Sequence, residues 1–146
     1  MTTAFVAGRF DGLTAVVTGA GSGIGKATAE RLLAEGATVV ASDISTERLD
    51  AFAAEAATER LLTVAGDVSA PETAQAILDA AGGRVDALVN NAGVMDGFLP
   101  TAEITDEVWE RVLNVNLTGP MRLTRAVVPS MVERGSGTLV HVSREP

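Results

Sequence analysis

The strongest constraint in the sequence is a regular alternation of short, Val-rich apolar runs with longer stretches rich in Ala, Leu and Glu. Strands that alternate with helices in this way form a parallel sheet covered by helices on both faces. The chain is therefore predicted to be an α/β protein with a single domain over residues 1–146. The runs that fit buried strands are Leu13–Thr18, Thr38–Ser42, Leu61–Ala65, Val85–Val89 and Thr138–Ser143.

The stretches between these runs carry signals for helix ends. Gly36 ends a predicted helix over Gly23–Glu35, because glycine adopts the left-handed conformation that closes helices. Ser45 is a good N-cap for the following helix. Ser69-Ala70-Pro71-Glu72 fits a capping box that opens a helix over Ala70–Ala81.

A long helix is predicted from an N-cap at Thr105 to about Arg134, where Gly135-Ser136-Gly137 breaks it. Apolar side chains recur along it at helical spacing, which is typical of a helix that packs against a core, and we expect Trp109 and the methionines to lie in the core or to line a pocket. The recurring apolar positions are Val108, Trp109, Val112, Leu113, Leu117, Met121 and Val127.

Composition excludes several classes of function. The chain has no cysteine and one histidine, which excludes disulfides and thiolate or His-rich metal sites. Its formal net charge of -8 argues against nucleic acid and anionic membrane as partners. Met1–Asp11 lacks the pattern of a signal peptide and no apolar run reaches membrane-spanning length, so we expect a soluble, cytoplasmic protein.

Thr18-Gly19-Ala20-Gly21-Ser22-Gly23-Ile24-Gly25 lies between the first predicted strand and the first predicted helix. A pyrophosphate can meet backbone N–H groups and the positive end of the helix dipole at such a turn. Gly19 permits the tight exit from the strand, Gly23 lets the backbone approach phosphates, and Gly25 lets the helix pack closely. An ordinary glycine turn is the alternative, but the strand–turn–helix setting favours nucleotide binding. The candidate cofactor-binding residues here are Gly19, Ser22, Gly23, Ile24 and Gly25.

Asp43 follows the second predicted strand, where an acidic side chain can accept hydrogen bonds from the adenosine ribose hydroxyls. A 2′-phosphate ~4 Å from this carboxylate would cost about 4 kcal/mol at an effective dielectric near 20. No arginine or lysine occurs in Thr18–Gly25 or Ser42–Thr46 to offset that repulsion. The sequence therefore predicts NAD, rather than NADP, as the cofactor. A solvated loop aspartate near the cap at Ser45 is the alternative interpretation.

Three motifs together resemble the N-terminal, nucleotide-binding part of the short-chain dehydrogenase/reductase family. They are Thr-Gly-x-x-x-Gly-x-Gly at Thr18–Gly25, Asp67-Val68 after the third strand, and Asn90-Asn91-Ala92-Gly93 after the fourth. The resemblance extends from about Phe10 to Ser143. It implies a Rossmann-type doubly wound parallel sheet of strand order 3-2-1-4-5, with a dinucleotide at the carboxyl edge.

The resemblance also implies roles for residues beyond the glycine turn. The carboxylate of Asp67 and the backbone of Val68 would hold the adenine, while Asn91, Ala92 and Gly93 would pass beneath the ribose. Ala92 and Gly93 are small enough to let a ligand approach the backbone, and the asparagine amides can tie neighbouring strands. A simple Asn-rich turn is the alternative.

Asn116 resembles the asparagine of the family's Asn-Ser-Tyr-Lys tetrad, whose main-chain carbonyl holds a water, and is the one candidate catalytic residue. Pro120 lies four residues on and has no N–H to donate to that carbonyl, so a kink is predicted there. A surface asparagine in a helix broken by Gly119-Pro120 is the alternative.

The family pattern breaks near the end of the chain. The register of the catalytic serine falls on Arg144, and there is no Tyr-x-x-x-Lys pair, because the chain has no tyrosine and only one lysine, Lys26. Lys26 is expected to pair with Glu30 at the surface, and His141 to be structural. We expect a chain truncated after its fifth strand, which self-associates through that exposed edge.

The resemblance implies hydride transfer between NAD and a small alcohol or carbonyl substrate in the complete protein. This chain would be its cofactor-binding part, inactive alone, and either a fragment, a frameshift product or the result of an incorrectly assigned gene end. A non-catalytic dinucleotide-binding or regulatory module is the alternative, and a nonfunctional truncation is the third. The family's substrate loop is absent, so the sequence predicts no particular substrate.

Overall fold

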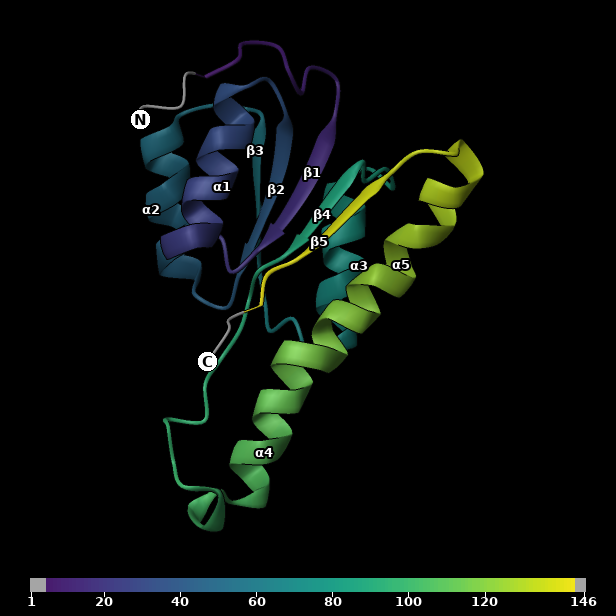
Figure 1. Ribbon diagram of the computed structural model, residues 1–146. Helices are drawn as coiled ribbons and strands as arrows, with labels where there is room; N and C mark the ends of the chain where they lie inside the picture. The colour runs from purple at the N-terminus through teal and green to yellow at the C-terminus, as the bar shows by residue number, and fades with distance from the viewer. Residues whose placement is uncertain (1–4, 144–146) are drawn as a thin grey trace.

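The computed structural model describes residues 5–143 and contains a parallel five-stranded sheet between two layers of helices (Figure 1). The strand order is β3-β2-β1-β4-β5, and every neighbouring pair is parallel. The predicted fold class and strand order are confirmed. The strands are β1 (Thr14–Thr18), β2 (Thr38–Asp43), β3 (Leu61–Ala65), β4 (Ala87–Asn90) and β5 (Thr138–His141).

The helices divide between the two faces of the sheet. Figure 1 shows α1 (Gly23–Ala34) and α2 (Thr46–Ala56) on one face, and α3 (Pro71–Ala80) and α5 (Gly119–Arg134) on the other. The helix α4 (Asp106–Leu113) extends beyond the end of the sheet. The chain moves outward from β1 to β3 and then returns to β4 on the other side of β1, which creates a switch point between β1 and β4.

The Val-rich strands contribute side chains to two separate cores, because neighbouring side chains on a strand point to opposite faces of the sheet. Val16 and Val40 pack with Ile77 and Leu123 on the side of α3 and α5. On the side of α1 and α2 the second core contains Val17, Ala29, Leu33, Val39, Leu49 and Phe52. The three central strands, β1, β2 and β4, are buried on both faces, which explains why their sequences are mostly apolar rather than alternating.

Most of the predicted helix ends are confirmed. Ser45 Oγ accepts from the N–H of Arg48 at 3.3 Å, and Thr105 Oγ1 accepts from the N–H of Val108 at 3.4 Å. Gly36 follows α1 with a φ of 109°, the left-handed conformation that its position requires.

The capping box predicted at Ser69–Glu72 is wrong. The N-cap of α3 is Ala70, which makes no side-chain hydrogen bond. The backbone N–H and the hydroxyl of Ser69 instead donate to Asp67 Oδ1, at 2.8 and 2.7 Å. The ionised carboxylate of Asp67 is a stronger hydrogen-bond partner for Ser69 than the backbone N–H groups at the start of α3. Ser69 therefore closes the loop after β3 instead of capping the helix.

The single long helix predicted after Thr105 is interrupted by a π-helical turn, Asn114–Thr118, between α4 and α5. This turn ends two residues before Pro120, where a kink was predicted, and the N–H of Gly119 donates to the carbonyl of Asn114. Because a π-helical turn inserts a residue, it shifts which side chains face the sheet.

The predicted apolar face along these helices is only partly buried. Val127 is buried as predicted, together with Leu123 and Met131. Trp109 is 56% exposed and lines none of the described cavities, so its predicted place in the core or in a pocket is wrong, and Leu117 is 64% exposed. The helix α4 lies beyond the sheet edge, where no strand lies beneath it (Figure 1). Met121 and Leu113 are also exposed.

Strand ends differ from prediction at the carboxyl edge. Asp43 is the last residue of β2, and Asn90 the last of β4, so both are strand residues and not loop residues. β5 ends at His141 rather than Ser143. Arg144, the position predicted to align with a catalytic serine, lies outside the described residues.

Candidate functional site

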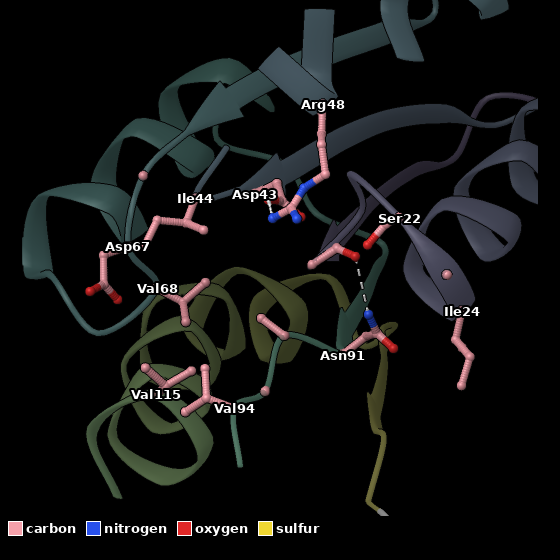
Figure 2. A pocket seen from close by; sticks show the side chains of 15 residues that line it. Ser22, Ile24, Asp43, Ile44, Arg48, Asp67, Val68, Asn91, Val94 and Val115 are labelled. Carbon is pink, nitrogen blue, oxygen red and sulfur yellow. Dashed lines mark hydrogen bonds and ion pairs between the residues drawn. The ribbon is translucent and has the colours of Figure 1, made fainter. Parts of the chain in front are cut away.

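A cleft of about 460 Å³ opens at the carboxyl ends of the strands, at the switch point between β1 and β4 (Figure 2). It brings together residues from five separate segments of the chain, four of which follow or end a strand, while the fifth is the π-helical turn. All but one of the predicted cofactor-binding residues line it: Gly19, Ser22, Gly23, Ile24, Asp43, Asp67, Val68, Asn91, Ala92 and Gly93. The remaining one, Gly25, is buried and does not line the cleft.

The glycine turn has the geometry that its sequence predicts. Gly19 leaves β1 with a φ of 64°, and a methyl group on Gly25 would lie 2.2 Å from the carbonyl oxygen of Gly19. Only glycine therefore allows α1 to begin this close to the turn. A methyl group on Gly23 would meet nothing within 4 Å, so the space in front of the first turn of α1 is open.

The N-terminus of α1 has backbone donors to offer. Its N-cap, Ser22, is extended and makes no side-chain capping bond. The first N–H groups of a helix have no intrahelical partner, and the helix dipole adds positive potential there. This end of α1 borders the cleft through Ser22, Gly23 and Ile24. The arrangement fits an anionic group such as a pyrophosphate.

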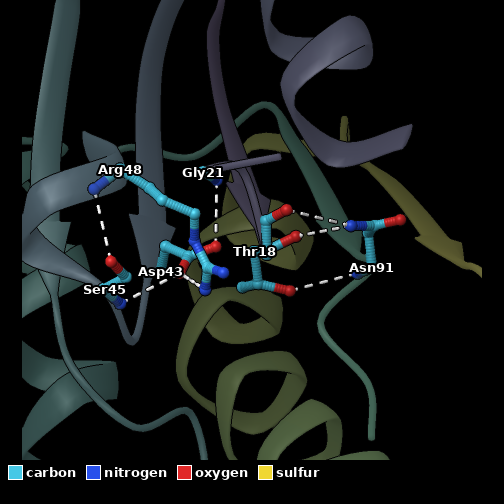
Figure 3. Close-up of polar contacts among 7 residues, drawn as sticks. Thr18, Gly21, Asp43, Ser45, Arg48 and Asn91 are labelled. Carbon is cyan, nitrogen blue, oxygen red and sulfur yellow. Dashed lines mark hydrogen bonds and ion pairs between the residues drawn. The ribbon is translucent and has the colours of Figure 1, made fainter. Parts of the chain in front are cut away.

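Thr18 joins the glycine turn to the loop that follows β4 (Figure 3). Its Oγ1 accepts from the N–H groups of both Asn91 and Ala92, each at 3.0 Å. The amide Nδ2 of Asn91 in turn donates to the carbonyl of Thr18 at 3.0 Å and to that of Gly19 at 3.4 Å. The predicted tie between neighbouring strands through Asn91 is therefore present. Sequence reasoning missed the threonine side chain, which is almost fully buried.

Asp43 lies at the centre of a hydrogen-bond network on the cleft wall (Figure 3). Its Oδ1 accepts from the N–H of Ser45 at 2.9 Å and from Arg48 Nη2 at 2.7 Å, and its Oδ2 accepts from the N–H of Gly21 at 2.9 Å. The side chain is 5% exposed, so the alternative of a solvated loop aspartate is wrong.

Burial alone would raise the pKa of Asp43, but the donors from Ser45, Arg48 and Gly21 together hold the pKa below its usual value. The carboxylate is therefore ionised at neutral pH. An ionised acceptor at the end of β2 suits recognition of hydroxyl groups.

Two residues of this network were missed by sequence reasoning. A methyl group on Gly21 would lie 2.8 Å from the carboxylate of Asp43, so this glycine lets the turn approach the acid. No basic residue occurs in Ser42–Thr46, but Arg48, two positions further along, reaches back to Asp43. The signal was available, because a Ser45 N-cap places Arg48 in the first turn of α2, beside the end of β2.

The adenine candidates lie on the wall of the cleft formed by the loop after β3. Asp67 is exposed and its Oδ1 is bound to Ser69, while Val68 is 7% exposed. Figure 2 shows both side chains at the rim opposite the glycine turn. The cleft also contains apolar side chains that sequence reasoning did not identify: Ile44, Val94 and Val115.

Asn116 lies in the π-helical turn and clamps the loop after β4. Its Oδ1 accepts from the N–H of Val94 and its Nδ2 donates to the carbonyl of Val94, both at 2.8 Å. The residue is solvent-exposed, yet both polar atoms of its side chain are engaged. The predicted catalytic role, which belongs to the main-chain carbonyl, is compatible with this contact.

Asn116 also borders a second, larger cavity of about 1540 Å³ beside the first. His141 and Ser143 line it from β5 and the residues after it, and His141 Nδ1 lies 3.4 Å from Asn90 Nδ2. Lys26 does not line this cavity and pairs with Glu55 and, at 3.9 Å and as predicted, with Glu30. Over residues 5–143 no group of three or more His, Cys, Asp or Glu side chains could hold a metal, and no helix is long and apolar enough to cross a membrane.

Comparison with known families agrees with the geometry. A family model described as short chain dehydrogenase matches residues 13–145. The chain is 43% identical to 3beta-hydroxysteroid dehydrogenase 2 of Eggerthella lenta, over 88% of this chain and 52% of that protein. It is 40% identical to 3-oxoacyl-(acyl-carrier-protein) reductase FabG of Thermotoga maritima, over 92% of this chain and 56% of that protein. The chain thus spans about half the length of the curated relatives it matches.

Solved structures show the same relationship. The crystal structure of 3-ketoacyl-(acyl-carrier-protein) reductase from Brucella melitensis complexed with NADH superimposes with a TM-score of 0.86 at 32% identity. The match covers 92% of this chain and 58% of that one. These relatives are named as dehydrogenases and reductases, which does not favour the alternative of a non-catalytic module.

Proposed function

The chain belongs to the short-chain dehydrogenase family, and from that premise we propose that it is the NAD-binding part of an oxidoreductase that acts on an alcohol or carbonyl group. The observation that carries the proposal is that two features lie side by side in one cleft. The uncapped N-terminus of α1 borders the cleft, and the ionised carboxylate of Asp43 lies beside the glycine turn that precedes this helix, where it accepts from the N–H of Gly21. A dinucleotide carries phosphates and ribose hydroxyls that suit this pair.

In this proposal the two halves of the cleft bind different parts of the dinucleotide. Ser22, Gly23 and Ile24 offer backbone donors to the pyrophosphate, and Gly25 keeps α1 close enough to do so. Asp43 accepts from the adenosine ribose. The NADH bound by the Brucella melitensis relative supports the same class of ligand here.

The walls of the cleft bind the remaining groups. Asp67 and Val68 hold the adenine, since they border the cleft on the side of Asp43. Asn91, Ala92 and Gly93 pass beneath a ribose, in a loop that Thr18 fixes in place. All of these residues belong to segments that follow a strand, so one sheet edge positions the whole set.

The bound dinucleotide would supply hydride exchange with the substrate carbon. The chain's own contribution is to bind and orient: the clamp between Asn116 and Val94 fixes the π-helical turn against the loop beneath the ribose. With its side chain so engaged, Asn116 offers its main-chain carbonyl for the water-holding role that the family resemblance implies. The larger cavity beside it provides room for a substrate.

We propose that NAD is preferred to NADP, because the ionised Asp43 accepts hydroxyl donors and repels a 2′-phosphate. Calorimetric titration of the 146-residue chain with NADH and NADPH tests this directly. NADH should bind more tightly, and Asp43→Ala should narrow the difference. Equal or tighter binding of NADPH by the wild type would reject the NAD preference while leaving dinucleotide binding intact.

A further inference from the structure

Arg48 introduces a positive charge into the cleft that the proposed NAD preference does not use. The guanidinium Nη2 lies 2.7 Å from Asp43 Oδ1, and Figure 2 shows it directed across the mouth of the cleft. The arginine side chain is 48% exposed, whereas that of Asp43 is 5% exposed. Arg48 thus lies between the buried carboxylate and the solvent from which a ligand enters.

Arg48 is held in this position by its place in the helix. Its N–H donates to the N-cap hydroxyl of Ser45, which fixes the first turn of α2 against the end of β2. A methyl group on Gly21 would lie 2.9 Å from the Cβ of Arg48, so the glycine turn packs against the base of the arginine side chain. The guanidinium therefore lies beside the glycine turn and Asp43 at once.

The ion pair changes what the carboxylate can offer a ribose. An ionised carboxylate has about four acceptor positions. Gly21, Ser45 and Arg48 already use three of them in Asp43, two on Oδ1 and one on Oδ2. One position therefore remains for a ribose hydroxyl, and removal of Arg48 would free a second.

The ion pair also changes what the cleft does to a 2′-phosphate. Asp43 would repel a 2′-phosphate, whereas Arg48, at a similar distance, would attract it with an energy of comparable size. Arginine suits this contact, since its planar guanidinium matches phosphate oxygens and is always charged. The carboxylate by itself would exclude the phosphorylated cofactor, but the pair tolerates it.

We propose that Arg48 is a specificity-determining residue of the nucleotide cleft, which weakens the preference for NAD and admits NADP as a second, weaker ligand. The inference rests on the proposed function, because it concerns the same cleft. It assigns the two opposing contributions to separate residues: Asp43 selects the free ribose, and Arg48 selects the phosphorylated one.

The test is a set of binding titrations with NADH and NADPH, with no activity readout. The variants are Arg48→Met, Asp43→Asn and the double variant, with Arg111→Met as the matched control. Arg111 is an exposed arginine of α4 that does not line the cleft, so its replacement removes the same charge elsewhere. Circular dichroism checks that each variant is folded.

The wild type should bind NADPH measurably and more weakly than NADH. Arg48→Met should raise the ratio of NADPH to NADH dissociation constants about tenfold, which corresponds to about 1.4 kcal/mol. Asp43→Asn should reverse the preference, and the double variant should bind the two cofactors to within about threefold of one another. Added salt should weaken NADPH binding more than NADH binding, and more so with Arg48 present.

If Arg48→Met and Arg111→Met both keep the wild-type ratio of NADPH to NADH dissociation constants, the inference is wrong. The proposed function would still stand in that case, provided that the protein binds NADH. A wild type that binds neither cofactor would overturn both. If Asp43→Asn fails to fold, the comparison of Arg48→Met with Arg111→Met decides alone, since neither of these substitutions removes the acid at the end of β2.

Discussion

Replacement of Thr18 by valine should destabilise the protein, because two backbone N–H groups of the loop after β4 would lose their hydrogen-bond acceptor. Valine keeps the shape and β-branching of threonine but removes Oγ1, the acceptor for the N–H groups of Asn91 and Ala92. A buried donor left without a partner costs about 1–3 kcal/mol. Both donors are half-buried, so we take the lower part of that range for each and expect a total loss of about 2–3 kcal/mol.

Thr18→Ser is the matched control, because it keeps the hydroxyl and loses only a methyl group worth about 1 kcal/mol. Urea denaturation followed by far-UV circular dichroism measures both variants. With a denaturant slope of about 1–3 kcal/mol per molar urea, the midpoint of Thr18→Val should fall by roughly 0.7–3 M and lie below that of Thr18→Ser. A Thr18→Val midpoint equal to or above that of the serine variant would refute the role given to Oγ1.

Three further outcomes are expected. The chain should self-associate, as measured by light scattering, because Leu139 and Val140 of β5 are 38% and 42% exposed and the outer edge of β5 pairs with no strand in residues 5–143. Val140→Lys should shift the protein toward monomer. A wild-type protein that stays monomeric at high concentration would contradict this expectation. Burial alone would raise the pKa of Asp86, but the Thr14 N–H and the arginines Arg84 and Arg134 hold the pKa below its usual value. The ionised form therefore stabilises the fold above the unfolded pKa of about 3.9, and this stabilisation is lost as the pH falls through the folded pKa. Asp86→Asn should melt below wild type at neutral pH and approach it in acid; a constant difference in melting temperature would exclude this linkage. Finally, the 146-residue chain alone should show no turnover of aldehydes or ketones in an NADH absorbance assay, since it has no tyrosine and general acid catalysis is worth about 10²–10⁴-fold. Robust turnover by material of the correct mass would point to His141 or Ser143 as a proton donor.

The fold was predictable because its signals are local and repeated. Each buried strand is a short Val-rich run, and each break between elements carries a glycine or a capping residue such as Ser45. The positions of the cleft residues followed from the same logic, because parallel strands place their carboxyl ends at one edge. Asp43, Asp67 and Asn91 could therefore be placed at the cleft from the sequence.

Other features depended on competition between contacts that sequence patterns do not rank. Ser69 had two uses, as an N-cap or as a donor to Asp67, and the carboxylate determined the outcome. The partner of Asp43 could not be recognised from the residues next to it in the chain, because Arg48 lies in the following helix and its long side chain reaches back to the carboxylate. Trp109 follows a helical apolar pattern, but the pattern does not reveal that α4 extends past the sheet.

The π-helical turn Asn114–Thr118 makes the length of this connection hard to change. Deleting one residue, for example Val115, would restore regular α-helical hydrogen bonding and a locally more favourable helix. It would also rotate everything beyond the deletion by about 100° relative to α4. Either Leu123 and Val127 would leave the core, or Asn116 would lose its hydrogen bonds to the backbone of Val94. The less favourable π-helical turn therefore lets one continuous helical segment satisfy two requirements at once. Residues of α5 face the core, and Asn116 faces the loop beside the cleft.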